Sequence, residues 1–63
     1  MYTISENFLG FYIERKERRK TLYFYGIRKG IPVFTTDHLY KRYFRTEKSA
    51  QKMIDRLELH RAK

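Results

Sequence analysis

Five of the seven residues in the stretch ERKERRK, residues 14–20, carry positive charge. These cations repel one another because they lie within one Debye length, about 8 Å at physiological salt. The repulsion is offset when the cations neutralise the phosphates of a polyanion and release its condensed counterions. A solvated hairpin tip that keeps a sheet edge from aggregating is the alternative. We favour phosphate binding, for which the candidates are Arg15, Lys16, Arg18, Arg19 and Lys20.

Three tyrosines form a second group of candidates. Alternation along two expected strands places Tyr12, Tyr23 and Tyr25 on one face of a sheet and Leu, Phe and Ile on the other. Exposed aromatic rings can stack on single-stranded bases, and a two-stranded ribbon fits the major groove of DNA, about 12 Å wide. Tyrosines that only cover a thin sheet are the alternative. Further cations extend this basic surface or form an ordinary solvated face: Arg28, Lys29, Lys41, Arg42, Arg45, Lys48, Lys52 and Arg56.

Catalytic and metal-binding chemistry finds little support in the sequence. The two histidines, His38 and His60, are expected in a loop and near a helix end, and neither serine lies in a nucleophile elbow. The three glycines are isolated, so they form no phosphate-binding loop. No spacing of histidines and carboxylates is typical of a metal site. We therefore expect a non-enzymatic protein without a cofactor or a metal.

The elements that position these residues are expected from the hydrophobic pattern. Residues 1–7 show no period and are expected to be a loose N-terminus. Alternation predicts strands over residues 8–13, 21–27 and 31–35, and Pro32 favours an edge position for the last of them. On this interpretation the basic run is a connection of about seven residues, longer than the two to five of a tight hairpin.

The second connection is expected to be a three-residue hairpin over residues 28–30. Gly30 can adopt the positive φ that such a turn requires, and the turn brings a bulge with it. Because a bulge resets the alternation, the sequence leaves open whether Val33 or Phe34 points inward.

A helix is predicted over residues 46–61, with Thr46 as N-cap and Glu47 in the first turn, where the helix dipole favours a carboxylate. Tyr43 and Phe44 are expected to precede it as an extended pair anchored in the core. The fold class is therefore α+β, a three-stranded antiparallel sheet packed on one C-terminal helix. The expected core consists of Leu9, Phe11, Ile13, Leu22, Phe24, Phe44, Ala50, Met53, Ile54 and Leu57.

Length and composition limit the whole chain. Residues 1–63 are expected to form a single small basic domain, with the sheet in 8–45. A chain this short buries only about 60% of its surface, so a homodimer could add stability. The formal net charge of +8 attracts polyanions: nucleic acid, an anionic membrane or an acidic protein surface. No segment approaches the roughly 20 apolar residues of a membrane span, so we expect no membrane partner. The absence of cysteine fits the cytoplasm.

The β-β-β-α order, with the stretches LYFYGIRKGIPVF and TEKSAQKMIDRL, resembles the arm-type DNA-binding domains at the N-termini of phage and transposon tyrosine recombinases. The resemblance covers roughly residues 8–60 and implies a sheet inserted into the major groove. The chain lacks the catalytic recombinase domain, which leaves only the binding module. The stretch PVFTTDHLYKRYFRTEKSAQKMI is also similar to small accessory proteins of phages and prophages, some of which inhibit host defence or replication proteins.

Three functions follow from these patterns. The first is a nucleic-acid-binding module, with duplex DNA favoured, in the cytoplasm, or in the host cytoplasm if a phage encodes the chain. The second is a phage-type inhibitor or adaptor whose basic surface binds an acidic or nucleic-acid-binding host protein. The third is a structural, self-associating protein without a specific ligand. The first predicts DNA affinity that depends strongly on salt, and the second predicts a tight protein partner with weak DNA binding.

Overall fold

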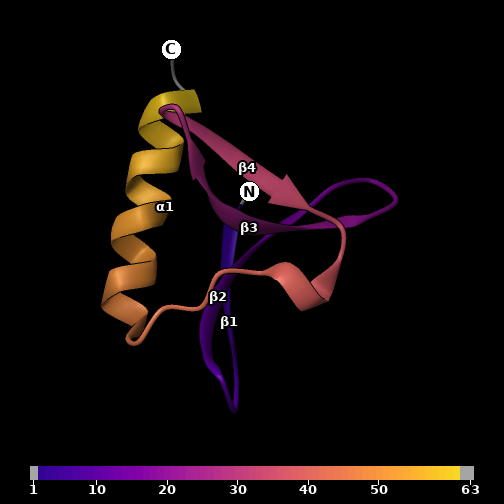
Figure 1. Cartoon of the computed structure of the whole chain (residues 1–63), viewed down its shortest axis with the longest axis vertical. Helices are drawn as coiled ribbons and strands as arrows, with labels where there is room; N and C mark the ends of the chain where they lie inside the picture. The colour runs from indigo at the N-terminus through magenta and orange to yellow at the C-terminus, as the bar shows by residue number, and fades with distance from the viewer. Residues whose placement is uncertain (1, 62–63) are drawn as a thin grey trace.

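The computed structural model describes residues 2–61 as one antiparallel sheet with a helix against one of its faces (Figure 1). The α+β class with a C-terminal helix is confirmed, but the sheet has four strands in the order β1-β2-β3-β4, not three. The elements are β1 (Tyr2–Asn7), β2 (Gly10–Lys16), β3 (Thr21–Arg28), β4 (Ile31–Thr35), the 3₁₀ helix η1 (His38–Tyr40) and α1 (Glu47–Arg61).

The N-terminal residues form a strand, so the predicted loose start is wrong. β1 pairs with β2 along its whole length, from Tyr2 opposite Arg15 to Asn7 opposite Gly10. Only Tyr2 and Ile4 of its six residues pack against the core. Such sparse apolar content gives no periodic signal, and the strand is held by its backbone pairing with β2.

The β1–β2 turn corrects one predicted core residue. Phe8 and Leu9 form the turn and are 94% and 59% exposed, so Leu9 does not lie in the core. The Leu9 N–H donates to Asn7 Oδ1 at 2.9 Å, which stabilises the turn. β2 therefore begins at Gly10, two residues later than the pattern predicted.

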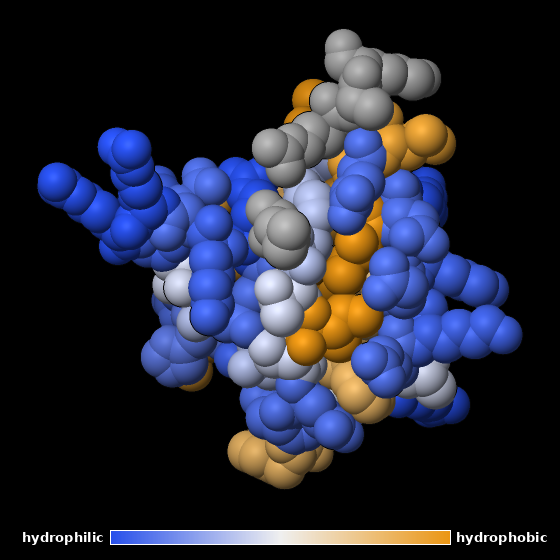
Figure 2. Space-filling model, turned by 180° about the vertical axis from the view of Figure 1, so that it is seen from behind, coloured by the Kyte–Doolittle hydropathy of each residue, from blue (hydrophilic) through white to orange (hydrophobic). Residues whose placement is uncertain are grey.

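The core lies between α1 and the sheet. Its buried members, all predicted, are Ile13, Phe24, Ala50, Ile54 and Leu57, each at most 4% exposed. Three other predicted core residues are partly buried and pack against this cluster, and Leu22 is half-buried. Three residues that were not predicted also pack against it. The predicted ones are Phe11, Phe44 and Met53. The others are Tyr2, Ile4 and Phe34. Seen from behind, apolar side chains form a stripe with hydrophilic side chains on either side (Figure 2).

The helix starts as predicted. The Ser49 N–H donates to Thr46 Oγ1 at 3.1 Å, so Thr46 caps the first turn. Within residues 2–61, no helix combines the length and the apolar composition needed to cross a membrane.

A bulge in β3 settles the orientation of β4. Phe24 pairs with Phe34 and Gly26 pairs with Val33, so Tyr25 is an extra residue on β3. Phe34 points inward, and its ring lies 5.8 Å from that of Phe24. Val33 consequently lies on the opposite face of the sheet, where it borders Tyr25.

The β3–β4 connection is shorter than predicted. Arg28 pairs with Ile31, which leaves a loop of only Lys29 and Gly30 in place of a three-residue turn. Both residues have positive φ, 52° for Lys29 and 79° for Gly30. That pattern is a type I′ turn, whose twist matches that of the flanking strands.

Lys29 is the strained residue of this turn, because a side chain with a Cβ atom is disfavoured at positive φ. Lys29→Asn should raise the free energy of unfolding by about 1 kcal/mol, since Asn tolerates this conformation. Urea denaturation followed by circular dichroism measures the change. Lys29→Ala removes the same charge but lacks the short polar side chain whose local hydrogen bonds let Asn adopt positive φ, so it should give no gain. Equal midpoints for the two variants would show that the backbone conformation of residue 29 stores no strain.

The segment between η1 and α1 fills a gap in the sheet. β2 and β3 pair only from Glu14 opposite Tyr23 to Lys16 opposite Thr21 and then diverge. Beyond that point the backbone of Phe44 exchanges two hydrogen bonds with Phe11, at 3.0 and 2.6 Å. The Arg42 N–H donates to the Phe24 carbonyl at 2.9 Å. Residues 42–44 therefore lie between the two strands.

Gly10 is required where this segment passes the start of β2. Its φ is +139°, and a Cβ atom there would lie 2.9 Å from the Phe44 carbonyl oxygen. A larger residue would force the inserted segment away from β2.

Candidate nucleic-acid interface

The basic run lies mostly at the end of the β2–β3 hairpin. β2 continues to Lys16, so the connection is residues 17–20, shorter than the seven residues expected. The Glu17 N–H donates to the Lys20 carbonyl at 2.8 Å and closes the turn. Figure 2 shows long hydrophilic side chains projecting from the side of the molecule where this turn lies. The exposed cations here, which we call the basic tip, are Lys16, Arg18, Arg19 and Lys20.

Arg15 does not join the basic tip, contrary to the sequence-based grouping. It is a residue of β2 whose side chain lies on the same face as Ile13, toward the helix. The guanidinium carbon is 4.6 Å from the centroid of the Phe34 ring. Its Nη2 also lies 3.7 Å from Glu17 Oε1. Arg15 thus packs against the edge of the core and pairs with the carboxylate of the turn.

The three predicted tyrosines lie on the sheet face opposite the helix, as expected. Phe24 is 1% exposed whereas Tyr25 is 42% exposed, which confirms the predicted phase of β3. The rings of Tyr12 and Tyr23 lie 6.1 Å apart and are tilted by 59°. Adjacent strands therefore place these aromatic rings side by side on one surface.

The inserted segment brings Lys41 and Tyr43 to the same face. Lys41 Nζ is 4.0 Å from the centroid of Tyr12 and 5.0 Å from that of Tyr23, within cation–π range. The prediction that Tyr43 is anchored in the core is wrong. Its ring packs edge-on against Tyr12 at 6.0 Å, and Asn7 Nδ2 donates to its hydroxyl at 3.2 Å. The ammonium group of Lys41 therefore lies over the rings of Tyr12 and Tyr23 and places a positive charge on this face.

A second aromatic pair lies further along β3. Tyr40, from η1, meets Tyr25 in a T-shaped arrangement with centroids 6.4 Å apart. Both rings remain in contact with solvent, since Tyr40 is 58% exposed. The five tyrosines on this side of the sheet, which we call the tyrosine face, are Tyr12, Tyr23, Tyr25, Tyr40 and Tyr43.

The other candidate cations lie outside the basic tip and the tyrosine face. Arg28 and Lys29 lie at the end of β3 opposite the basic tip. The Arg42 guanidinium carbon lies 5.9 Å from the ring of Phe44, a partner of the core, and Arg45 is exposed just before α1. The helix cations Lys48, Lys52 and Arg56 are exposed on an element that packs against the other face of the sheet.

His38, the histidine whose side chain the structure describes, does not pair with its neighbour Asp37. The Asp37 carboxylate accepts the Leu39 N–H at 3.0 Å as the cap of η1, and His38 is exposed. His60 is placed within α1, but its side chain lies outside what the structure describes. Among residues 2–59, whose side chains the structure describes, no three His, Cys, Asp or Glu side chains come together as metal ligands.

Sequence reasoning missed Tyr40 and Tyr43 as members of this surface. The sequence does indicate the position of Tyr43, because this residue lies between Arg42 and the core residue Phe44 in an extended segment. Neighbours in an extended chain point to opposite faces, so Tyr43 must point away from the core. Tyr40 had no such signal, since its place depends on η1 folding back onto β3.

Comparisons with protein-family models, with curated proteins and with solved structures gave no match to this chain.

Proposed function

We propose that the protein is a non-enzymatic nucleic-acid-binding module whose basic tip binds backbone phosphates. The observation that carries the proposal is the placement of four exposed cations at the end of one hairpin. None of the four forms an ion pair with any residue that the structure describes. The only carboxylate in the turn, that of Glu17, is engaged by Arg15 instead.

The electrostatics of the basic tip favour a polyanion. Four like charges within a short turn repel one another in the free protein, because they lie within a Debye length of about 8 Å. A phosphate backbone removes this repulsion and releases counterions. The chain as a whole adds a long-range attraction, with a formal net charge of +8.

The β2–β3 ribbon also suits the duplex form of DNA. Its exposed face runs from Tyr12 past Tyr23 to Lys16 and the turn. Glu14 is the one carboxylate along this path within the paired region, and it accepts a hydrogen bond from the Ser5 hydroxyl. Beyond Arg15 and Tyr23, where pairing with β1 and β4 ends, the hairpin is two-stranded, and such a ribbon fits the major groove, about 12 Å wide. With the tip bound to phosphates in the groove, the tyrosine hydroxyls would lie beside the backbone.

The resemblance to arm-type DNA-binding domains applies to only part of the fold. β1 adds a strand that the three-stranded expectation lacks, and it pairs on the side of β2 away from β3. The β2–β3–β4 meander and the helix are the portion to which the resemblance would apply. The proposed mode of binding does not depend on it, because it rests on the charges of the basic tip.

Fluorescence anisotropy of a labelled duplex across a salt series tests the proposal. If all four tip cations contact phosphates, log affinity should fall against log salt with a slope of about −3.6. Different duplex sequences should bind alike, since phosphate contacts carry no sequence information. Absence of binding at about 50 mM salt would remove the proposal. A tight acidic protein partner would then account for the tip, as in the inhibitor or adaptor hypothesis.

A further inference from the structure

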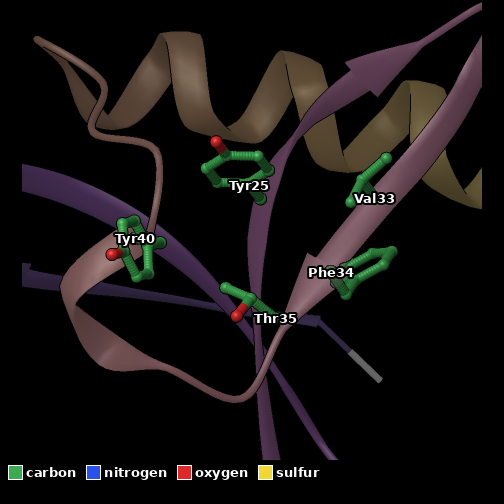
Figure 3. A pocket seen from close by; sticks show the side chains of 5 residues that line it. All are labelled: Tyr25, Val33, Phe34, Thr35 and Tyr40. Atoms are coloured by element: carbon green, nitrogen blue, oxygen red, sulfur yellow. The ribbon is translucent and has the colours of Figure 1, made fainter.

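A hollow of about 360 Å³ opens on the tyrosine face between β3, β4 and η1. Its lining residues come from all three elements (Figure 3). Tyr25 and Tyr40 stand on one side of the view, and the residues of β4 lie along the other. The lining consists of Tyr25, Val33, Phe34, Thr35 and Tyr40.

Local backbone features shape this hollow. Tyr25 is the extra residue of the β3 bulge, and bulges re-aim the side chains they carry. Tyr40 is held over β3 by η1, which Asp37 caps through the Leu39 N–H at 3.0 Å. The planes of the Tyr25 and Tyr40 rings are 88° apart. An aromatic ligand between them would therefore stack on the face of one ring and meet the edge of the other.

The chemistry of the lining selects a neutral, planar ligand. No charged side chain lines the hollow, so it does not suit a phosphate or a carboxylate. Val33 supplies an apolar wall and the two tyrosine rings supply aromatic ones, while both tyrosine hydroxyls point away from the side chains of β4 (Figure 3). Thr35 Oγ1 accepts the Asp37 N–H at 3.0 Å, and its own hydrogen remains for an acceptor on a ligand. Aromatic walls with one hydroxyl group beside them match a nucleobase.

We propose that this hollow binds one unpaired nucleobase, so that the protein prefers nucleic acid with an unstacked base. The inference rests on the proposed function and adds a base contact to the phosphate contacts of the basic tip. A proline-rich peptide also docks on aromatic side chains. The charge of the chain favours the nucleobase, because +8 draws a polyanion, not a neutral peptide, to this surface.

The test compares two labelled strands with the same phosphates. One is oligothymidine of about 12 nucleotides, within the usual site size of a stacking surface, and the other is an abasic strand of equal length. Wild-type protein should bind oligothymidine roughly 5- to 150-fold more tightly, the range that one stacked base supplies. Tyr25→Ala and Tyr40→Ala should each lose most of that gain and leave the salt slope of abasic binding nearly unchanged. Tyr25→Phe should keep most of it.

Leu39→Ala is the matched control, because Leu39 belongs to η1, is 74% exposed and does not line the hollow. It should bind both strands as the wild type does. Thermal unfolding of every variant checks that the fold is intact, and both tyrosines are exposed enough for truncation to be tolerated.

The outcomes separate this inference from the proposed function. Equal binding of the two strands by the wild type would overturn the inference and leave phosphate binding standing. Tyrosine-dependent binding of oligothymidine without any abasic binding would support the inference and remove the role of the basic tip. Failure to bind either strand would end both. Tyr25-dependent binding of a proline-rich peptide, with no gain from bases, would assign the hollow to a peptide instead.

Discussion

Phe24→Ala should remove a large part of the protein's free energy of unfolding. The Phe24 ring is 1% exposed and packs against the rings of Phe34 and Phe44, with centroids 5.8 and 6.3 Å away. Truncating such a residue destabilises a fold by about 3–5 kcal/mol. At roughly 0.05–0.15 kcal/mol per residue, a chain of 63 residues has about 3–9 kcal/mol in total. Far-ultraviolet circular dichroism with a urea titration measures the loss.

Tyr25→Ala is the control for this substitution, because Tyr25 is the neighbouring aromatic residue on the same strand and is 42% exposed. Its loss of stability should be less than half that of Phe24→Ala. Similar losses for the two variants would contradict the assignment of Phe24 to the core and Tyr25 to the outer face. The tyrosine face and its hollow depend on that assignment.

The double substitution Arg18→Ala with Arg19→Ala should have the largest effect on binding. Both side chains are exposed at the turn, so the free energy of unfolding should change by no more than about 0.5 kcal/mol. If each arginine neutralises one phosphate, the salt slope should fall by about 1.8. At about 0.15 M salt, the lost counterion release corresponds to a roughly 30-fold lower affinity for duplex DNA. Anisotropy titrations of the two proteins at matched salt measure both quantities.

Tyr23→Ala provides a second reference in the same titrations. Tyr23 is uncharged and belongs to the tyrosine face, so its loss should reduce contact area and leave the slope nearly unchanged. A double arginine variant that keeps the full slope would mean that the protein binds nucleic acid through another surface.

The sequence was most informative where alternation and helical spacing were uninterrupted. Leu22 to Tyr25 alternate cleanly, and Thr46 precedes a regular apolar stripe, so β3 and α1 were placed within one or two residues. β1 was missed because only Tyr2 and Ile4 in it contact the core. Its stability comes from backbone pairing with β2, which apolar periodicity does not record.

The sequence predicts too long a basic connection, because a dense run of charged residues indicates a turn even where the strand continues. Arg15 and Lys16 continue β2, and the guanidinium of Arg15 rests on the Phe34 ring. Long cationic side chains can cover apolar surface with their stems while they occupy strand positions. A charged residue next to a strand is therefore poor evidence that the strand has ended.

The hollow on the tyrosine face lay beyond sequence-based prediction for a different reason. It needs the bulge at Tyr25 and the return of η1 onto β3. Each is a contact between residues distant in sequence or an irregularity in pairing. Alternation indicates which face a side chain takes, but it does not indicate where a loop will cross that face.

A comparison of two charge-matched variants tests most directly whether the basic tip binds phosphates. Arg18→Ala with Arg19→Ala removes two cations from the tip, and Lys48→Ala with Lys52→Ala removes two exposed cations from α1. Each variant lowers the formal net charge from +8 to +6, so any general effect of charge is the same for both. We expect the tip variant to lose about 1.8 units of salt slope on duplex DNA and the helix variant to keep nearly all of it. Equal losses, or a larger loss for the helix variant, would contradict the assignment of phosphate binding to the β2–β3 turn.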